Sequence, residues 1–139
     1  MVASQVQTWL NVMQIPFETN EDKTRFFTEW SLDGKSFKVI INVRVDGWIQ
    51  ITALLIESKD IPAERKLEIL EHLMKDNWEL DDVTYSMDKD GNIYSENDIP
   101  GHSNVETFLT ELNAVVYGAK RFFSNFEDII GIEKPSVLN

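Results

Sequence analysis

His72 is flanked by acidic residues, Glu68 four positions before it and Asp76 four positions after it. On a helix this spacing puts the three side chains on one face, where an imidazole and two carboxylates offer the ligand types of a metal site. Charged residues at such positions are more typical of a solvated helix face. The sequence has no HExxH motif and only two histidines. We therefore expect no metal at His72.

Asp88, Asp90 and Gly91 have the spacing found in the middle of an EF-hand calcium loop. With Gly91 at the sixth loop position, the twelfth falls on Asn97, where such a loop needs a bidentate glutamate. Asp and Asn side chains bond their own backbone in tight turns, and Gly accepts a positive φ, so the same residues are typical of a β-hairpin. We expect a hairpin turn here and no cofactor.

No other pattern in the chain indicates catalysis. The sequence contains no Gly-rich phosphate loop, no nucleophile elbow and no cysteine, which excludes disulfides and thiol chemistry. We predict no catalytic residues and expect that the protein is not an enzyme. The formal net charge is −11, from 13 basic and 24 acidic residues. Since a nucleic-acid binder needs a cationic surface, we expect no nucleic-acid partner.

The chain has no pattern typical of export or membrane insertion. Residues 1–10 lack the basic and apolar regions of a secretory signal. The longest apolar run, residues 53–56, is far shorter than the about 20 residues that span a bilayer. We therefore expect no membrane partner and a cytoplasmic location.

The length of 139 residues fits one domain, since domains typically hold about 100–200 residues. We expect a single domain over residues 1–139, with residues 131–139 as a frayed tail. The order helix, three strands, helix, two strands, helix follows from apolar periodicity and from Gly and Pro positions. Because the strands form hairpins, we expect an α+β fold with an antiparallel sheet and helices packed on it. The expected strands cover residues 25–31, 37–45, 48–56, 83–87 and 93–99.

The helices have identifiable starts and inner faces. Ser4 is expected to cap the first helix, and Ser103 with Glu106 forms a capping box for the last one. In the helix after Pro62 the inner stripe is expected to be Leu67, Leu70 and Met74, widened by Ile69 and Leu73.

A final helix over residues 103–130 would be about 42 Å long, longer than a domain of this size needs. We expect it to break near Gly118 or to pack its end on something else. The residues that need cover there include Phe122, Phe123 and Phe126. They pack on the first helix or form an oligomer or partner contact.

The first hairpin decides which residues are accessible. A two-residue turn at Asp46-Gly47 would pair Ile41 with Thr52 and Val39 with Leu54. The opposite face would then be partly apolar, and we expect a helix of this chain, a second subunit or a bound peptide to cover it. A turn of odd length would swap the faces. The residues expected to bind a partner are Ile40, Ile49, Ile51 and Leu55.

From the central helix through the second hairpin, the chain combines regular apolar spacing with an Asp-x-Asp-Gly turn. The residues are Leu70, Leu73, Asn77, Val83, Tyr85, Met87, Asp88, Asp90, Gly91, Ile93, Tyr94 and Ile99. Together with the order of elements, this pattern resembles the YbjN-like family, whose fold is shared with the class I chaperones of type III secretion. The resemblance implies binding without catalysis, because type III chaperones are small, acidic, mostly dimeric proteins that hold an extended cargo segment on apolar patches.

We therefore expect a non-enzymatic protein-binding module, chaperone-like or regulatory, that holds a partner segment on its sheet and helix surface and that forms a homodimer. Addition of a peptide to a sheet edge is an alternative geometry. The alternative function is a small-ligand-binding domain or an enzyme with a pocket between the sheet and the C-terminal helix. Convergent polar groups near His72 or His102 would favour that alternative. A purely structural subunit of a larger assembly is a third possibility.

Overall fold

The computed structural model describes residues 2–130, so the expected frayed tail at 131–139 lies outside the described residues. The expected order of helices and strands is confirmed, with short additions. The elements are α1 (Val2–Val12), β1 (Glu18–Thr19), β2 (Arg25–Leu32), β3 (Lys35–Val43), β4 (Ile49–Ile56), the 3₁₀ turns η1 (Ser58–Asp60) and η2 (Ala63–Arg65), α2 (Lys66–Glu79), β5 (Tyr85–Met87), β6 (Ile93–Ile99), α3 (Val105–Asn125) and α4 (Glu127–Ile130).

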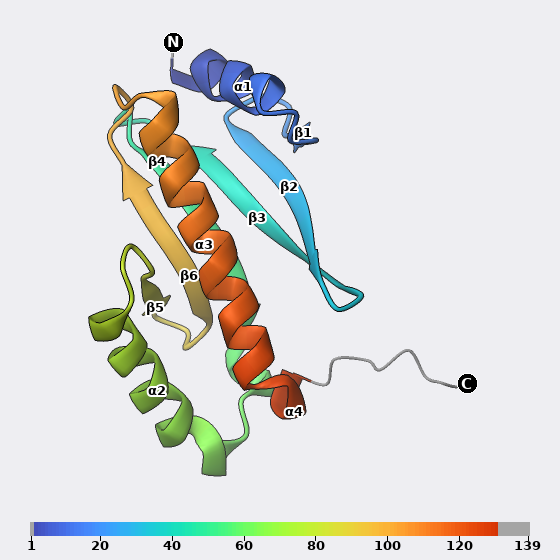
Figure 1. The fold of residues 1–139 in the computed structure, drawn as a ribbon, viewed down its shortest axis with the longest axis vertical. Helices are drawn as coiled ribbons and strands as arrows, with labels where there is room; N and C mark the ends of the chain where they lie inside the picture. The colour runs from blue at the N-terminus through green and yellow to red at the C-terminus, as the bar shows by residue number, and fades with distance from the viewer. Residues whose placement is uncertain (1, 131–139) are drawn as a thin grey trace.

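The strands form one antiparallel sheet in the order β1-β2-β3-β4-β6-β5. The long helix α3 lies across one face of this sheet, and α1 sits at one end of that layer (Figure 1). Helix α2 lies beside the short edge strand β5 and also contacts α3. The fold is therefore α+β, as expected, with its helices on one side of the sheet.

The register of the central hairpin differs from the expected one by a single residue. Ile41 pairs with Ile51, where a two-residue turn would have paired it with Thr52. The backbone N–H of Arg44 bonds the carbonyl of Trp48, which leaves a loop of three residues, and Gly47 closes it at φ +90°. A loop of this length ends in a glycine bulge and slips the pairing by one position. The two-residue turn occurs instead at the preceding hairpin, where Leu32 pairs with Lys35.

The slip gathers the apolar residues of the central strands on one face. On that face every side chain of β3 and β4 from Phe37 to Leu55 is apolar, and α3 covers it with its own buried stripe. The buried residues are Phe37, Val39, Ile41, Ile49, Ile51, Ala53 and Leu55 from the sheet, and Phe108, Leu112, Val115, Val116, Ala119, Phe122 and Phe123 from α3. The core therefore lies between the sheet and α3.

Two helix starts differ from expectation. Ser4 lies inside α1, where its carbonyl accepts a hydrogen bond from the Thr8 hydroxyl. Asn104 caps α3 in place of Ser103, because its side chain accepts the backbone N–H of Thr107. Asn is as good a cap as Ser, and one residue separates the two candidates.

The inner face of α2 also differs from expectation. Ile69 and Leu73 are buried, whereas Leu67 and Met74 are each 70% exposed. Since Ile69, Leu73 and Asp76 share one side of the helix, Leu67 and Met74 fall on the other. The expected inner stripe was therefore wrong at Leu67 and Met74, whereas Leu70 is partly buried against the core and Ile69 and Leu73 are inside, as expected.

Helix α3 continues through Gly118 without a break. A Cβ at Gly118 would lie 2.6 Å from the Ser95 hydroxyl oxygen and 3.1 Å from Val83, so the glycine allows a close approach between α3 and the sheet. Tyr85 reaches the same point and donates a hydrogen bond of 2.7 Å to the Gly118 carbonyl.

Substitution of Gly118 by Ala should destabilise the protein by roughly 1–3 kcal/mol, because the added methyl overpacks the contact with Ser95. The same substitution in a Ser95→Ala background should cost less, since the clashing oxygen is gone. Urea unfolding of the four proteins in this cycle measures the coupling. Independent, additive effects would contradict the close contact.

Candidate protein-binding surfaces

The sheet face opposite α3, which we call the bare face, consists of alternate residues of four strands. They are Arg25, Phe27 and Glu29 of β2, Lys38, Ile40 and Asn42 of β3, Gln50, Thr52 and Leu54 of β4, and Tyr94, Glu96 and Asp98 of β6. All of them are half-buried or exposed. Antiparallel sheets commonly have one solvated face of this kind.

Only one of the four residues expected to bind a partner lies on the bare face. Ile40 is half-buried there, in one row with Phe27 of β2 and Thr52 of β4. Ile49, Ile51 and Leu55 lie on the opposite side of the sheet, buried under α3. The expected common face was therefore wrong, for the same reason that the register was wrong. Ile40 is the member of the set that a partner can reach.

A groove of about 370 Å³ lies at the β2 edge of the sheet, lined by Pro16, Phe17, Glu18, Phe27, Thr28, Glu29 and Lys38. Strand β1 covers only part of this edge, since it pairs with Phe26 and Phe27 and ends there. Beyond Phe27, the backbone groups of β2 that point away from β3 have no strand beside them within residues 2–130. This edge can accept an extended segment.

The bare face carries titratable groups with different surroundings. Burial raises the pKa of the Glu96 carboxyl, and the neighbouring charge of Asp98 raises it further. Toward the opposite edge of the same face, on β2, the Arg25 guanidinium lies 5.6 Å from the centre of the Phe27 ring. Both cations of this face, Arg25 and Lys38, are thus on β2 and β3 together with the acid Glu29, whereas β6 carries the two acids Glu96 and Asp98.

A second accessible apolar surface, the α2 patch, consists of Leu67, Leu70, Met74, Trp78 and Met87. Trp78 is 86% exposed, and Leu67 and Met74 are each 70% exposed. A shallow hollow between α2 and β5 is lined by Leu70, Met74 and Met87 among others. Because Ile69 and Leu73 are buried on the opposite side, α2 is apolar on two sides, which is unusual for a helix at the surface of a single subunit. The sequence reasoning missed Trp78, although its spacing of four and eleven residues from Met74 and Leu67 gave the signal.

An ion pair anchors the buried side of α2. Asp76, whose side chain is 7% exposed, accepts two hydrogen bonds from Arg121 of α3, at 2.9 and 3.1 Å. This bonding to Asp76 raises the pKa of Arg121. His72 Nε2 lies 3.3 Å from the same carboxylate and 3.1 Å from the Asn125 amide. The group around His72 thus joins two helices, and the expected solvated face was wrong at Asp76, which is buried and paired with Arg121.

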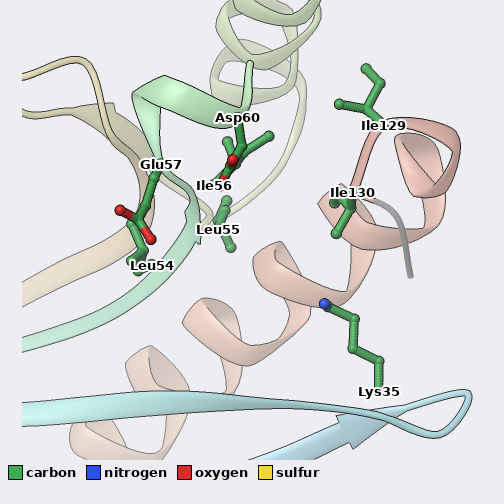
Figure 2. A pocket seen from close by; sticks show the side chains of 8 residues that line it. All are labelled: Lys35, Leu54, Leu55, Ile56, Glu57, Asp60, Ile129 and Ile130. Carbon is green, nitrogen blue, oxygen red and sulfur yellow. The ribbon is translucent and has the colours of Figure 1, made fainter. Parts of the chain in front are cut away.

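The pocket of the alternative function has a counterpart at the end of α3. A hollow of about 460 Å³ lies between the ends of β3 and β4 and helix α4 (Figure 2). Leu54, Leu55 and Ile56 form one wall and Ile129 and Ile130 another, with Lys35 entering from the β3 side. Neither His72 nor His102 lines this hollow. Its charged lining residues are Lys35, Glu57 and Asp60, so polar groups near a histidine, which would favour the alternative function, are not found in this hollow.

The aromatic residues expected to form an oligomer or partner contact are buried within this chain. Phe123 packs against Phe37 of β3, and Phe126 against His72 of α2. Phe122 contacts both Phe123 and Phe126. These aromatic residues pack on the sheet and on α2, not on α1. Their contact with a partner stays a prediction, and α3 would have to move away from the sheet to allow it.

The Asp-x-Asp-Gly turn is saturated by its own hydrogen bonds. The Asp88 carboxylate accepts from the backbone N–H groups of Asp90 and Asn92, from the Asn92 amide and from the Tyr94 hydroxyl. The hydrogen bond from the backbone of Asn92 has the largest effect on the pKa of Asp88. Together with those from the Asn92 amide, Tyr94 and Asp90, it lowers this pKa to about 2. These contacts are those of a hairpin turn.

Within residues 2–130 no group of three or more His, Asp or Glu side chains is placed to hold a metal ion. Among the same residues no helix is long and apolar enough to span a membrane.

Comparison with known proteins defines the class of fold. No family model matches the chain, and no curated protein matches it. Solved structures do: YbjN from E. coli is 13% identical, with a TM-score of 0.66, over 92% of this chain and 94% of YbjN.

Two type III secretion complexes contain a chain of the same fold. The complex of the Yersinia pestis chaperone SycH with a fragment of YscM2 matches at TM-score 0.57 and 12% identity, over 88% of this chain and 99% of that one. The ExoU–SpcU complex of Pseudomonas aeruginosa matches at TM-score 0.63 and 14% identity, over 87% and 97%. The chain thus has the fold shared by YbjN and type III secretion chaperones, which confirms the resemblance at the level of fold.

Replacing Arg121 by Ala should destabilise the protein, because it leaves the Asp76 carboxylate buried without its cation. We expect a loss of roughly 2 kcal/mol, less than for a fully buried pair because Arg121 is 34% exposed. The matched control is Arg44→Ala at the exposed Arg44–Asp46 pair, which should cost under about 1 kcal/mol. Equal losses in urea unfolding would show that Asp76 does not depend on Arg121.

Proposed function

We propose that this protein is a non-enzymatic, chaperone-like or regulatory module that holds an extended segment of a partner protein on its bare face. The observation that carries the proposal is the row of Phe27 and Ile40, accessible to solvent and continuous with the groove at the β2 edge. A chain laid across this row or added to the free edge of β2 would bury apolar side chains and pair backbone groups.

The comparisons support this proposal without deciding it. Chains of the same fold occur in structures with protein partners, including the SycH chaperone with a fragment of YscM2. Within residues 2–130 no group of side chains is placed to hold a metal ion. The strongly negative net charge of −11 would repel nucleic acid, which also favours a protein partner.

A photoreactive benzoylphenylalanine in place of Ile40 should cross-link to a second protein in the native cells, because the side chain would lie under the bound segment. The control carries the same group in place of Glu106, an exposed residue of α3 away from the bare face. Mass spectrometry identifies the product, and circular dichroism checks that both variants are folded. Equal yields at the two positions, or a product containing only this chain at position 40, would refute the proposal.

We further propose that the α2 patch is the contact between two copies of this protein. An antiparallel pair of α2 helices would place Leu67 of one copy on Trp78 of the other, with Leu70 and Met74 at the centre. The same arrangement brings Glu71 beside Lys75 of the second copy, twice, by symmetry. In this arrangement apolar residues meet apolar residues and Glu71 meets Lys75, so the patch is complementary to itself, as a two-fold interface requires.

Light scattering at high protein concentration should give about twice the subunit mass of 16.1 kDa. Trp78→Glu should give the monomer, because it places a charge at the most exposed apolar residue of the patch. Val12→Glu, at an exposed apolar residue of α1, is the control and should leave the dimer intact.

Charge reversal tests the antiparallel arrangement. Glu71→Lys alone should weaken the dimer, and adding Lys75→Glu should restore it. A monomeric wild type, or no rescue by the double reversal, would contradict this interface.

A further inference from the structure

The bare face carries its charge unevenly from one edge to the other. On β2 and β3 the cations Arg25 and Lys38 lie among the acids Glu18 and Glu29, which pair with Phe27 and Lys38, so this side of the face has mixed charge. On β6 the charged residues of the face are the acids Glu96 and Asp98. Between them the residues of the face are uncharged, such as Ile40 and Thr52. A segment that crosses the sheet from β2 to β6 therefore moves from an apolar region of mixed charge to an acidic region.

The two acids on β6 have no cationic partner among the residues that the structure describes. Within residues 2–130 the Glu96 and Asp98 carboxylates make no ion pair and no hydrogen bond. Glu96 is half-buried, and its burial, together with the charge of Asp98, raises the pKa of its carboxyl in the free protein. A cation placed beside the pair would relieve this repulsion.

The pairing register gives the spacing between the two kinds of site. Phe27, Ile40, Thr52 and Glu96 form one row across four neighbouring strands. Neighbouring strands are about 4.8 Å apart, so Ile40 and Glu96 are separated by about 10 Å. An extended chain rises about 3.3 Å per residue, and a lysine side chain adds reach of its own. An apolar residue over Ile40 therefore puts a lysine or arginine two to four residues later beside Glu96.

Resting on the function proposed above, we propose that the partner segment is cationic: it places an apolar side chain on Phe27 and Ile40 and a lysine or arginine beside Glu96 and Asp98. Charge complementarity selects this occupant, because an acidic segment would meet two unpaired carboxylates. The net charge of −11 would also speed the encounter with a basic segment.

Three synthetic peptides test this, each acetylated and amidated: TVTVTKTKT, the same peptide with glutamine for lysine, and the same with glutamate. Titration into the ¹⁵N-labelled protein should shift the amides of Ile40, Thr52 and Glu96. The lysine peptide should bind about fivefold more tightly than the glutamine peptide, the effect of two exposed ion pairs. Added salt should remove this preference.

The double variant Glu96→Gln/Asp98→Asn should lose the preference for lysine and keep the affinity for the glutamine peptide. The control, Glu106→Gln/Glu127→Gln, removes the same charge from exposed positions on α3 and α4 and should behave as the wild type. If the three peptides bind the bare face equally, the cationic preference is wrong and the binding face stands. If none shifts these amides, or if raising the protein concentration alone does so, both proposals fall.

Discussion

The three-residue turn at residues 45–47 sets the pairing of the two central strands, and the rest of the molecule depends on that register. With Ile41 opposite Ile51, the apolar residues of β3 and β4 gather on one face, and α3 can bury all of them in a single layer. A slip of one residue would put Ile49 and Ile51 in water and Gln50 and Thr52 under the helix, where each polar group would need a partner.

This concentration of apolar residues also determines what is left for binding. Since one layer of helix satisfies the core, the second face of the sheet needs no cover from its own chain. It keeps a short apolar row at Phe27 and Ile40 among polar neighbours. Such a mixed surface is soluble when free and can still bury apolar area with a partner, which suits a reversible contact.

Helix α2, in contrast to the bare face, has large apolar residues on its outer side as well as on its inner side. Its inner side is fixed by Ile69, Leu73 and the Asp76–Arg121 ion pair, so its outer side is held in place with Trp78 pointing away from the core. A buried ion pair adds little net stability, but it specifies the orientation of the helix. The two proposed surfaces are therefore separate: one is on the sheet, and the other is on a helix beside the far edge strand.

Much of the fold could be predicted from local chemistry. Asp33-Gly34, Asp46-Gly47 and Asp90-Gly91 marked the three hairpins, and the order of helices and strands followed from them. The register could not be predicted, because Asp46-Gly47 is compatible with loops of two or three residues, and only burial against α3 decides between them. The inner face of α2 was missed because the helix has apolar residues on both sides, so its periodicity does not say which side is buried. The charge pattern of the bare face depends on the same register: once Thr52 lies opposite Ile40, Glu96 joins their row.

Because the chain contains no cysteine, single-cysteine variants test the central claim most directly. Thr52→Cys and Ala53→Cys place a thiol on neighbouring residues of β4 that the structure assigns to opposite faces. In the isolated protein, a maleimide should label position 52 rapidly and position 53 only at the rate of unfolding. Protection of position 52 together with rapid labelling of position 53 would show the other register, and protection of both would show that the second face is covered.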